Sequence, residues 1–161
     1  MDRAAKAIEQ WNRERPDLDV SPMGVIGRLN EASSLIARDR LAPVFARFGL
    51  QSGEFDVLAT LRRSGTPYAL TPTELYEATM VTSGAMTARL DRLERAGLIA
   101  RRAHPTDRRG IVVQLTEKGR ALIDQALTTH VANEHEILSV LTRVERDTLA
   151  HLLGKLVGSL G

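Results

Sequence analysis

Cysteine is absent from this chain of 161 residues, and its absence excludes a group of sites. Disulfide bonds, thiolate metal sites, cysteine nucleophiles and thiol-based oxidant switches all need this side chain. Any sensing must therefore be noncovalent or use other side chains. Aromatic residues are also few, at 4% of the sequence, and Trp11 is the only tryptophan, so its fluorescence reports on a single position.

Long apolar runs and a secretion signal are missing as well. No stretch approaches the roughly 18 consecutive apolar residues that cross a membrane. The first six residues, Met1 to Lys6, lack the apolar centre of a signal peptide, so we expect a cytoplasmic protein. With 43% hydrophobic residues the chain can bury one good core but has little room for a second independent domain. One compact unit, alone or completed by a partner chain, is expected.

Motifs of common enzymes are missing too. The sequence has no Gly-rich phosphate loop, no His-Glu-x-x-His zinc motif and no nucleophile elbow. His130, Glu134 and His135 fall in a predicted helix, but histidines five residues apart point in different directions around its axis. Only His130 and Glu134 share a face, so we prefer a solvated helix face to a metal site. We predict no catalytic residues, no metal and no cofactor.

Helical periodicity dominates the N-terminal half. Residues 2–15 form a predicted helix, and a long apolar-periodic run follows from about 22 to 48, kinked or divided by Pro43 and closed by Gly49. A further helix is predicted over 54–63. Its expected inward-facing residues are Phe55, Leu58, Ala59 and Leu61.

The centre of the chain has the order of parts of a winged helix. Thr71 and Glu74 form a capping box with proline between them, so a short helix begins there. Thr82 starts a second helix that Gly97 ends, and two strands with alternating apolar residues follow, joined by a turn over 104–110. The predicted fold class is mainly α with a small β-wing (α+β), a winged helix-turn-helix.

Charge is concentrated in the same segment. Residues 82–120 contain nine Lys/Arg against four Asp/Glu, a local balance of +5, whereas the remaining 13 basic and 16 acidic residues give −3. The net charge of +2 therefore hides a basic segment on a mildly acidic body. This distribution is typical of a protein that binds nucleic acid, and double-stranded DNA is the predicted partner.

Two long helices are predicted at the C-terminal end, one capped by Thr116 that runs from about 117 to 140 and one over 145–160. The second carries an apolar stripe of Leu149, Leu152, Leu153, Leu156, Val157 and Leu160. This stripe could cap the core of its own chain. We favour dimerisation, because a winged helix of about 70 residues already has its own core and leaves the end segments to pack with each other and with a second copy.

These elements suggest three functional regions. Residues 1–48 are expected to supply N-terminal helices for dimerisation and a ligand pocket. Residues 49–120 form the predicted winged helix-turn-helix DNA-binding domain, and residues 121–161 the C-terminal dimerisation helices.

Several motifs occur in order and at compatible spacing between Leu50 and Arg120. They are Phe55-Asp-Val-Leu58, Thr71-Pro-Thr-Glu-Leu75, the helix from Gly84 to Leu98, Asp107-Arg-Arg109 and Leu115-Thr-Glu-Lys-Gly119. In these motifs the chain resembles the MarR family of bacterial transcription regulators, and its long end helices resemble the family's dimerisation domain. The resemblance implies a homodimer that binds pseudopalindromic DNA and usually represses transcription until a small molecule weakens the complex.

Three segments narrow the resemblance to one subfamily. They are the N-terminal helix with Trp11, residues 15–28 and residues 62–68. They are similar to the urate-responsive subfamily that includes HucR, PecS and MftR. In that group a tryptophan of the added helix, an aspartate of the helix before the DNA-binding pair and an arginine of the recognition helix line the ligand pocket. The resemblance assigns these roles to Trp11, Asp56 and Arg89. A fourth position, asparagine in HucR, falls on the shorter Ser64.

The chemistry of urate, a planar monoanion at neutral pH, agrees with these residue types. Arg89 offers a guanidinium fork for an anionic or carbonyl edge, and Trp11 offers a flat apolar surface. A helical wheel places Arg89 about 60° from the buried stripe of its helix, so it can reach a cleft behind the recognition helix. We expect Asp56 as its ion-pair partner without ligand. An anion would pair with Arg89, repel Asp56 and shift the recognition helix.

Plainer roles for the same residues stay open. An Asp-Arg pair between adjacent helices is often purely structural, and Trp11 could be a packing residue. Within the regulator class, the alternative effector is a phenolic or other aromatic compound. Outside it, the alternative is a winged helix used for protein contact without operator recognition.

For DNA, the expected contacts lie on the second helix of the pair and on the wing. Ser83, Thr87 and Arg92 are placed to meet phosphates or base edges. Arg108 and Arg109 tip the wing, and Arg109 is the residue we predict to enter a narrow A·T minor groove. A solvated basic turn without a DNA contact is the alternative.

Overall fold

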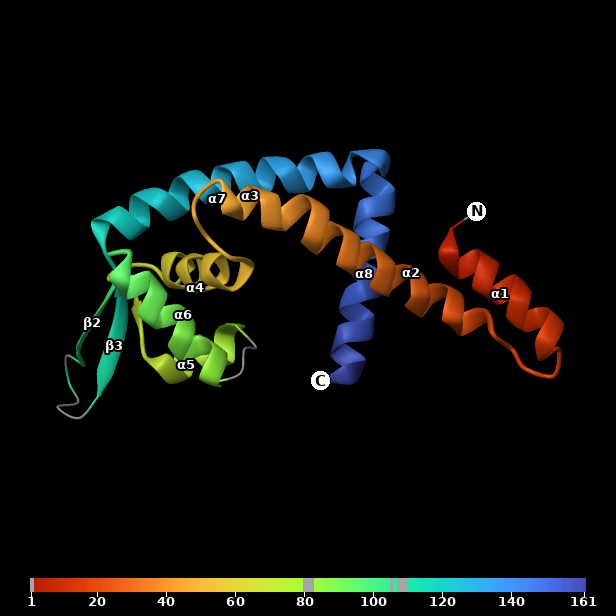
Figure 1. The fold of residues 1–161 in the computed structure, drawn as a ribbon, viewed down its shortest axis with the longest axis horizontal. Coiled ribbons are helices and arrows are strands. Elements are labelled where there is room, and N and C mark those ends of the chain that lie inside the picture. Colours follow the sequence, from red (N-terminus) through yellow and green to blue (C-terminus); the bar gives the residue numbers. More distant parts are fainter. Residues whose placement is uncertain (1, 80–82, 105, 107–109) are drawn as a thin grey trace. The chain divides into compact units, whose positions relative to one another are not determined.

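The computed structural model describes residues 2–79, 83–104, 106 and 110–161. The chain divides into two compact units, Met1–Pro43 and Val44–Gly161. The predicted starting residue of the recognition helix, Thr82, and the predicted wing-tip residues Arg108 and Arg109 lie outside the described residues. Figure 1 shows the order of the elements along the chain.

The first unit is built on two packed helices, α1 (Arg3–Glu14) and α2 (Ser21–Leu35). The Asp2 side chain caps α1 by accepting from the Ala5 backbone N–H at 2.7 Å, and it pairs with Arg28 of α2 at 2.9 Å. The helices approach closely at Gly27, where an added methyl group would lie 3.2 Å from Ala4 Cβ. The missing side chain at this position therefore allows α1 to lie against α2.

A wider turn precedes Pro43. The segment η1 (Ile36–Leu41) is a π-helix, and the Ala42 N–H donates to the Ala37 carbonyl five residues back, before α3 (Ala42–Ala46) continues the run. Proline has no N–H to donate, and its ring clashes with the carbonyl four residues before it in a regular helix. The expected break at Pro43 is therefore a π-helical turn within a continuous helical run.

The second unit contains a three-stranded sheet and the helix-turn-helix, whose helices α5 and α6 are labelled in Figure 1 together with strands β2 and β3. Its helices are α4 (Ser52–Arg63), α5 (Pro72–Thr79), α6 (Ser83–Arg95), α7 (Glu117–Ile137) and α8 (Arg143–Leu160), with a 3-10 turn η2 (Leu138–Val140). Its strands are β1 (Ala69–Leu70), β2 (Ile99–Ala103) and β3 (Ile111–Leu115). The fold class predicted from the sequence is confirmed.

The sheet has the antiparallel order β1-β3-β2. Strands β2 and β3 form the predicted wing, with Arg101 opposite Val113 in the register. Strand β1 was not predicted, because two residues are too few to show a period of two. Its pairing with β3 ties the start of α5 to the base of the wing.

Local signals set the ends of the helices as predicted. The Thr71 and Glu74 side chains exchange hydrogen bonds with each other's backbone N–H at 3.2 and 2.7 Å, which starts α5. Thr116 caps α7 by accepting from the Gly119 N–H at 2.9 Å. Gly97, which ends α6, has φ of 71°, a conformation that favours glycine.

The core of the second unit lies between α4, α5, α6, α7 and the sheet. Its fully buried side chains are Val57, Leu58, Leu61, Leu75, Leu93, Ile99, Val113 and Ile123. The predicted inward positions of α4 are buried except Ala59, which is half-buried. The stripe of Met86, Leu90 and Leu93 is buried in α6, so the rotation of this helix is fixed.

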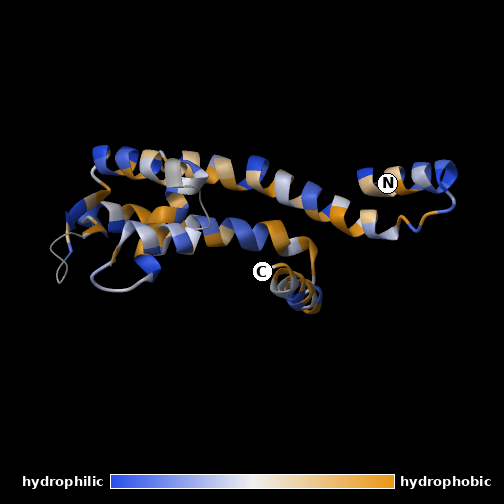
Figure 2. Ribbon diagram, turned by 90° about the horizontal axis from the view of Figure 1, so that it is seen from below, coloured by the Kyte–Doolittle hydropathy of each residue, from blue (hydrophilic) through white to orange (hydrophobic). Residues whose placement is uncertain are grey.

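Helix α8 has no buried residue. Four residues of its apolar stripe are exposed, among them Leu152, Val157 and Leu160 with exposed fractions of 56%, 67% and 80%, whereas Leu153 and Leu156 are half-buried. Figure 2 shows hydrophobic residues along this helix, near the C-terminal end. No helix in the described part of the chain is long and apolar enough to span a membrane.

Candidate functional site

Helix α6 presents one face to its own core and another to solvent. Thr87, one of the predicted DNA-contacting residues, lies on the exposed face, as do Ala88, Asp91 and Arg95. Ser83 begins the helix four residues before Thr87, so the two positions share a side of α6. The core therefore holds α6 in an orientation that leaves the side with Thr87 and Asp91 exposed to solvent.

Arg92, the third predicted DNA contact on α6, is engaged within the protein. Its Nε donates to Glu54 Oε1 at 2.7 Å, and its Nη2 donates to Gln51 Oε1 at 2.9 Å. The Glu54 side chain is only 8% exposed, whereas that of Arg92 is 42% exposed. In this structure the Arg92 guanidinium thus serves as the counter-charge of a buried carboxylate at the start of α4.

Sequence reasoning missed Glu54 and Gln51, although a signal for Glu54 is present. Glu54, Leu58 and Leu61 are spaced by four and three residues, so the carboxylate must lie on the buried face of α4. A buried carboxylate needs a hydrogen-bonding partner of opposite charge. One Glu54 oxygen accepts from the Gln51 backbone N–H at 2.8 Å and the other from Arg92.

Arg89 lies half-buried against the first turn of α4. A methyl group built on Gly53 would fall 2.1 Å from Arg89 Cζ and 2.3 Å from its Nε, so the guanidinium occupies the place of a side chain at residue 53. Arg89 Nη1 is buried and has no hydrogen-bond acceptor among the described residues. The predicted position at the edge of the buried stripe agrees with this half-buried placement.

Asp56 lies one turn along α4 from Gly53, on the same side of the helix. Although Asp56 is exposed at its outer edge, packing around its carboxyl raises its pKa above the ordinary value, and the positive charge of Arg89 is the largest influence in the opposite direction. Within the described part of the chain the expected direct ion pair between Asp56 and Arg89 is not formed. The two groups interact through space only.

A small cleft of about 180 Å³ opens beside Asp56. Thr60 and Arg63 of α4 line it together with Ala78 and Thr79 at the end of α5. Sequence reasoning did not single out these residues. Positions 56, 60 and 63 follow one face of a helix, so the helical spacing could have grouped Thr60 and Arg63 with Asp56.

Ser64 is not brought to Asp56 by the described geometry. Ser64 ends α4 eight residues after Asp56, roughly 12 Å along a helix axis, and its hydroxyl donates to the Leu61 carbonyl at 2.7 Å. Trp11 belongs to the first compact unit, where its side chain is 46% exposed. Among the predicted effector residues of the second unit, the structure places Asp56 and Arg89 near each other.

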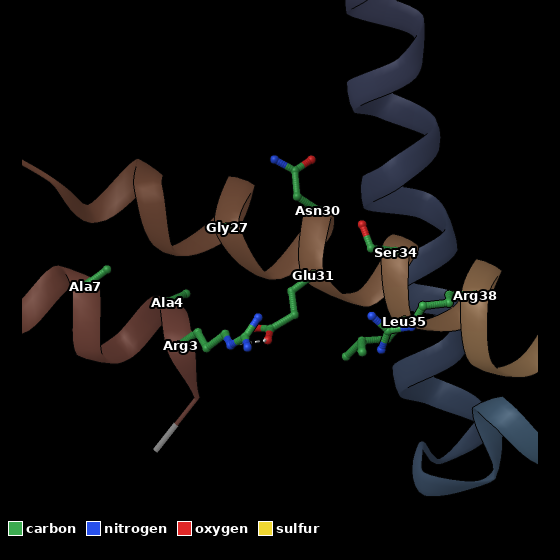
Figure 3. A pocket seen from close by; sticks show the side chains of 9 residues that line it. All are labelled: Arg3, Ala4, Ala7, Gly27, Asn30, Glu31, Ser34, Leu35 and Arg38. Atoms are coloured by element: carbon green, nitrogen blue, oxygen red, sulfur yellow. Dashed lines mark ion pairs between the residues drawn. The ribbon is translucent and has the colours of Figure 1, made fainter.

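The first unit has a cleft of its own, of about 450 Å³, between α1 and α2 (Figure 3). Arg3 and Arg38 lie along it, and Arg3 pairs with Glu31 across the cleft at 3.6 Å. Both arginines are largely exposed, at 91% and 71% of their side chains. Trp11 is not among the residues that line this cleft.

The base of the wing is tied to the recognition helix by Arg101. Its guanidinium pairs with Asp91 at 2.7 Å and with Glu94, both on α6, and its backbone N–H donates to Glu94 at 3.0 Å. The backbone hydrogen bond from Arg101 is the main cause that lowers the pKa of Glu94. The orientation of strand β2 is therefore fixed relative to α6.

His130 and Glu134 share a face of α7, as the spacing predicted, with His130 Nε2 and Glu134 Oε1 3.1 Å apart. The His130 ring packs on Phe55 with centroids 4.8 Å apart. Among the described residues, no group of three or more His, Cys, Asp or Glu side chains gathers as for a metal ion. This part of α7 thus contributes to the aromatic packing against α4.

Comparison with known proteins gives a consistent result. Residues 48–110 match the MarR family. The chain is 48% identical over 148 residues to the HTH-type transcriptional regulator PecS of Dickeya dadantii (strain 3937), a match that covers 92% of this chain and 89% of PecS. PecS was among the proteins named in the resemblance drawn from the sequence.

Solved structures agree with this relationship. A mutant MarR from E. coli, complexed with operator DNA, aligns with a TM-score of 0.73 and 30% identity over 91% of this chain and 96% of that one. A structure of Bordetella bronchiseptica BpsR, whose DNA binding is regulated by 6-hydroxynicotinic acid, aligns with a TM-score of 0.69 and 26% identity, covering 83% and 92% of the two chains.

Proposed function

Because the chain belongs to the MarR family of transcriptional regulators, we propose that it binds a pseudopalindromic operator as a homodimer, represses transcription, and is released by urate or a related purine anion. As a regulator of genes it acts on DNA and not as an enzyme. The observation that supports DNA binding most strongly is the similarity, over 91% of the chain, to a MarR protein complexed with operator DNA.

The electrostatics support the same proposal. The basic segment, with nine Lys/Arg against four Asp/Glu, coincides with the recognition helix and the wing. A protein that neutralises phosphates releases counterions, so its affinity falls steeply as salt rises. We assign Ser83 and Thr87 to the groove, and Arg108 and Arg109 to the backbone and the minor groove. Arg92 reaches DNA only if its contact with Glu54 is shared or broken.

The homodimer is supported by the exposed apolar stripe of α8. Water-exposed apolar surface of this extent is costly for a lone chain, and a second copy offers the same self-complementary surface. A dimer also matches the symmetry of a pseudopalindromic site, since each subunit places one recognition helix in the major groove.

The effector is assigned from charge and shape. Arg89 carries a buried nitrogen that has no acceptor among the described residues, next to Asp56, whose desolvated carboxyl gives it a raised pKa. An anion that binds between these two residues pairs with Arg89 and repels Asp56. If it binds only one of two conformations of the protein, it shifts the equilibrium between them towards that conformation. Trp11 and Ser64 keep their predicted roles as effector contacts in this proposal, on the resemblance of the sequence to the urate-responsive subfamily. The regulation of BpsR by an aromatic acid is in keeping with a small planar effector.

Fluorescence anisotropy tests the proposal directly. Labelled duplexes from the upstream region of the gene itself should bind in the range of about 10⁻⁸–10⁻¹¹ M at physiological salt, as specific sites do, with scrambled duplexes as the control. Urate or another purine should then release the DNA. Equal affinity for scrambled and upstream DNA would contradict operator recognition. Release by phenolic or hydroxynicotinic acids but by no purine would overturn the assignment of the effector.

A further inference from the structure

The first turn of α4 meets two of the three arginines of the recognition helix. Arg89 and Arg92 are three residues apart on α6 and therefore share a side of that helix. Gly53 lies under the Arg89 guanidinium, and Glu54 binds Arg92. Neighbouring residues of one turn thus contact the two arginines in different ways. Gly53 leaves space for the Arg89 guanidinium because it has no side chain, and Glu54 forms an ion pair with Arg92.

With Arg89 in its observed position, residue 53 has no space for a side chain. With a distance of 2.1 Å from Arg89 Cζ to a methyl carbon at position 53, alanine cannot coexist with the observed guanidinium position. The conflict involves the far end of a long flexible side chain, and Gly53 does not have a positive φ. An alanine at this position therefore moves Arg89 without disturbing the backbone of α4.

The contact at Glu54 behaves differently. Its carboxylate is buried, and both of its oxygens are used, one by the Gln51 backbone N–H at the start of α4 and one by Arg92. Separating Arg92 from Glu54 would leave a buried charge without its counter-charge, which is costly. The ion pair of Arg92 with Glu54 therefore anchors α6 to α4. Arg89, one turn away, has no such ion pair among the described residues and is the arginine that can move.

We propose that Gly53 is a positioning residue for effector sensing: the absence of a side chain there seats the Arg89 guanidinium flat against α4 beside Asp56, where an anion can engage it. This inference rests on the proposed effector function. An anion that binds the Arg89 guanidinium in this position pulls on α6 at Arg89, while Glu54 keeps Arg92 in place. Helix α6 therefore rotates about the Glu54–Arg92 contact. DNA binding itself does not need this placement of Arg89 over Gly53.

The test compares the Gly53→Ala variant of the full chain with the wild type and with Ser52→Ala, which changes an exposed residue of the same turn. In Gly53→Ala we expect unchanged DNA affinity, a melting temperature within about 2 °C of the wild type, and a urate concentration for half-release raised by about tenfold or more, within the usual range of allosteric coupling. Ser52→Ala should respond as the wild type does.

A second measurement does not depend on any effector. Since the charge of Arg89 lowers the pKa of Asp56, displacing the guanidinium should raise that pKa, which a carbon NMR titration of the Asp56 carboxyl measures in the two variants and the wild type. An unchanged Asp56 pKa in Gly53→Ala would show that Gly53 does not position the Arg89 guanidinium beside Asp56.

The outcomes separate this inference from the proposed function. If urate and related anions fail to release the wild-type complex, the effector assignment is wrong, and the Asp56 titration still decides whether Gly53 seats Arg89. If the wild type is released and Gly53→Ala is released at the same concentration, Gly53 has no part in sensing. If Gly53→Ala no longer binds DNA, the glycine serves the placement of the recognition helix and the inference is wrong.

Discussion

Asp56 shows how one residue can be tuned by two opposing influences. Burial of its carboxyl favours the neutral form, and the nearby Arg89 charge favours the ionised form, with burial the larger of the two. An acid whose pKa is raised on folding destabilises the protein when it is ionised, because the native state then binds the proton more tightly than the unfolded state does. The cost develops as pH rises from 3.8, the ordinary value, through the raised value.

The Asp56→Asn variant should remove this cost. We expect it to melt at a higher temperature than the wild type at neutral pH, and the difference should shrink towards zero as pH falls below 3.8, where Asp56 is protonated in both states. Thermal unfolding of both proteins across this pH range measures it. A wild type that is more stable than Asp56→Asn at neutral pH would show that the ionised carboxylate is stabilised, not penalised, in the native state.

The coupling of α4 to α6 is the feature that matters most at the scale of elements. It rests on Glu54, which caps its own helix and binds Arg92 of the next with the same carboxylate. The paired charges are unequal in their surroundings, since Glu54 is buried and Arg92 is 42% exposed. Solvent screening at Arg92 therefore reduces what the ion pair contributes, and the hydrogen bonds to a buried acceptor carry most of the effect.

Replacing Glu54 with glutamine should weaken this coupling. We expect Glu54→Gln to lower the free energy of unfolding by about 1–2 kcal/mol, because one charge-assisted hydrogen bond becomes a neutral one and another is strained or lost. Denaturant unfolding measures the change, and Glu77→Gln, at an exposed acid of α5, is the matched control. Equal stabilities of the two variants would mean that the Glu54–Arg92 contact does not hold α6.

Elements with a local signal could be predicted from the sequence. The capping box at Thr71 and Glu74, the cap at Thr116 and the glycine end of α6 at Gly97 fix their helices through neighbours in the chain, and the structure confirms each of them. The wing strands were predicted for the same reason, since five residues each suffice to show alternation.

Features that depend on distant partners could not be predicted. Strand β1 exists because β3 pairs with it, and two residues carry no pattern of their own. The choice of Glu54 as the partner of Arg92 depends on the crossing of two helices 38 positions apart in the sequence. The π-helical turn before Pro43 is a compromise between a continuing apolar stripe and a residue without an N–H, and the sequence alone predicted only a disturbance there.

At the scale of the whole molecule, the exposed stripe of α8 sets the expected assembly. A surface that places Leu152 and Val157 in water is suited to a second copy. The combined substitutions Leu152→Glu and Val157→Glu should convert a dimer into a monomer, because four like charges would face one another across a two-fold interface. Light scattering on a sizing column measures the mass.

The control for this prediction lies on the other side of the same helix. His151 is exposed and about 100° around the axis from Leu152, away from the stripe, so His151→Glu adds an acid to α8 and should leave the dimer intact. Loss of the dimer should also reduce operator affinity by more than about tenfold, since two linked recognition helices bind with avidity. A wild-type chain that is monomeric in solution would remove the basis for a two-fold operator.

The most direct test of the account is a titration of the preformed operator complex with urate, in the wild type and in Arg89→Ala, followed by anisotropy. The account predicts that both proteins bind the operator, that urate releases the wild type saturably, and that Arg89→Ala stays bound at concentrations that release the wild type completely, since it lacks the guanidinium over Gly53. Release of Arg89→Ala at the wild-type urate concentration, or failure of the wild type to bind any upstream duplex, would contradict it.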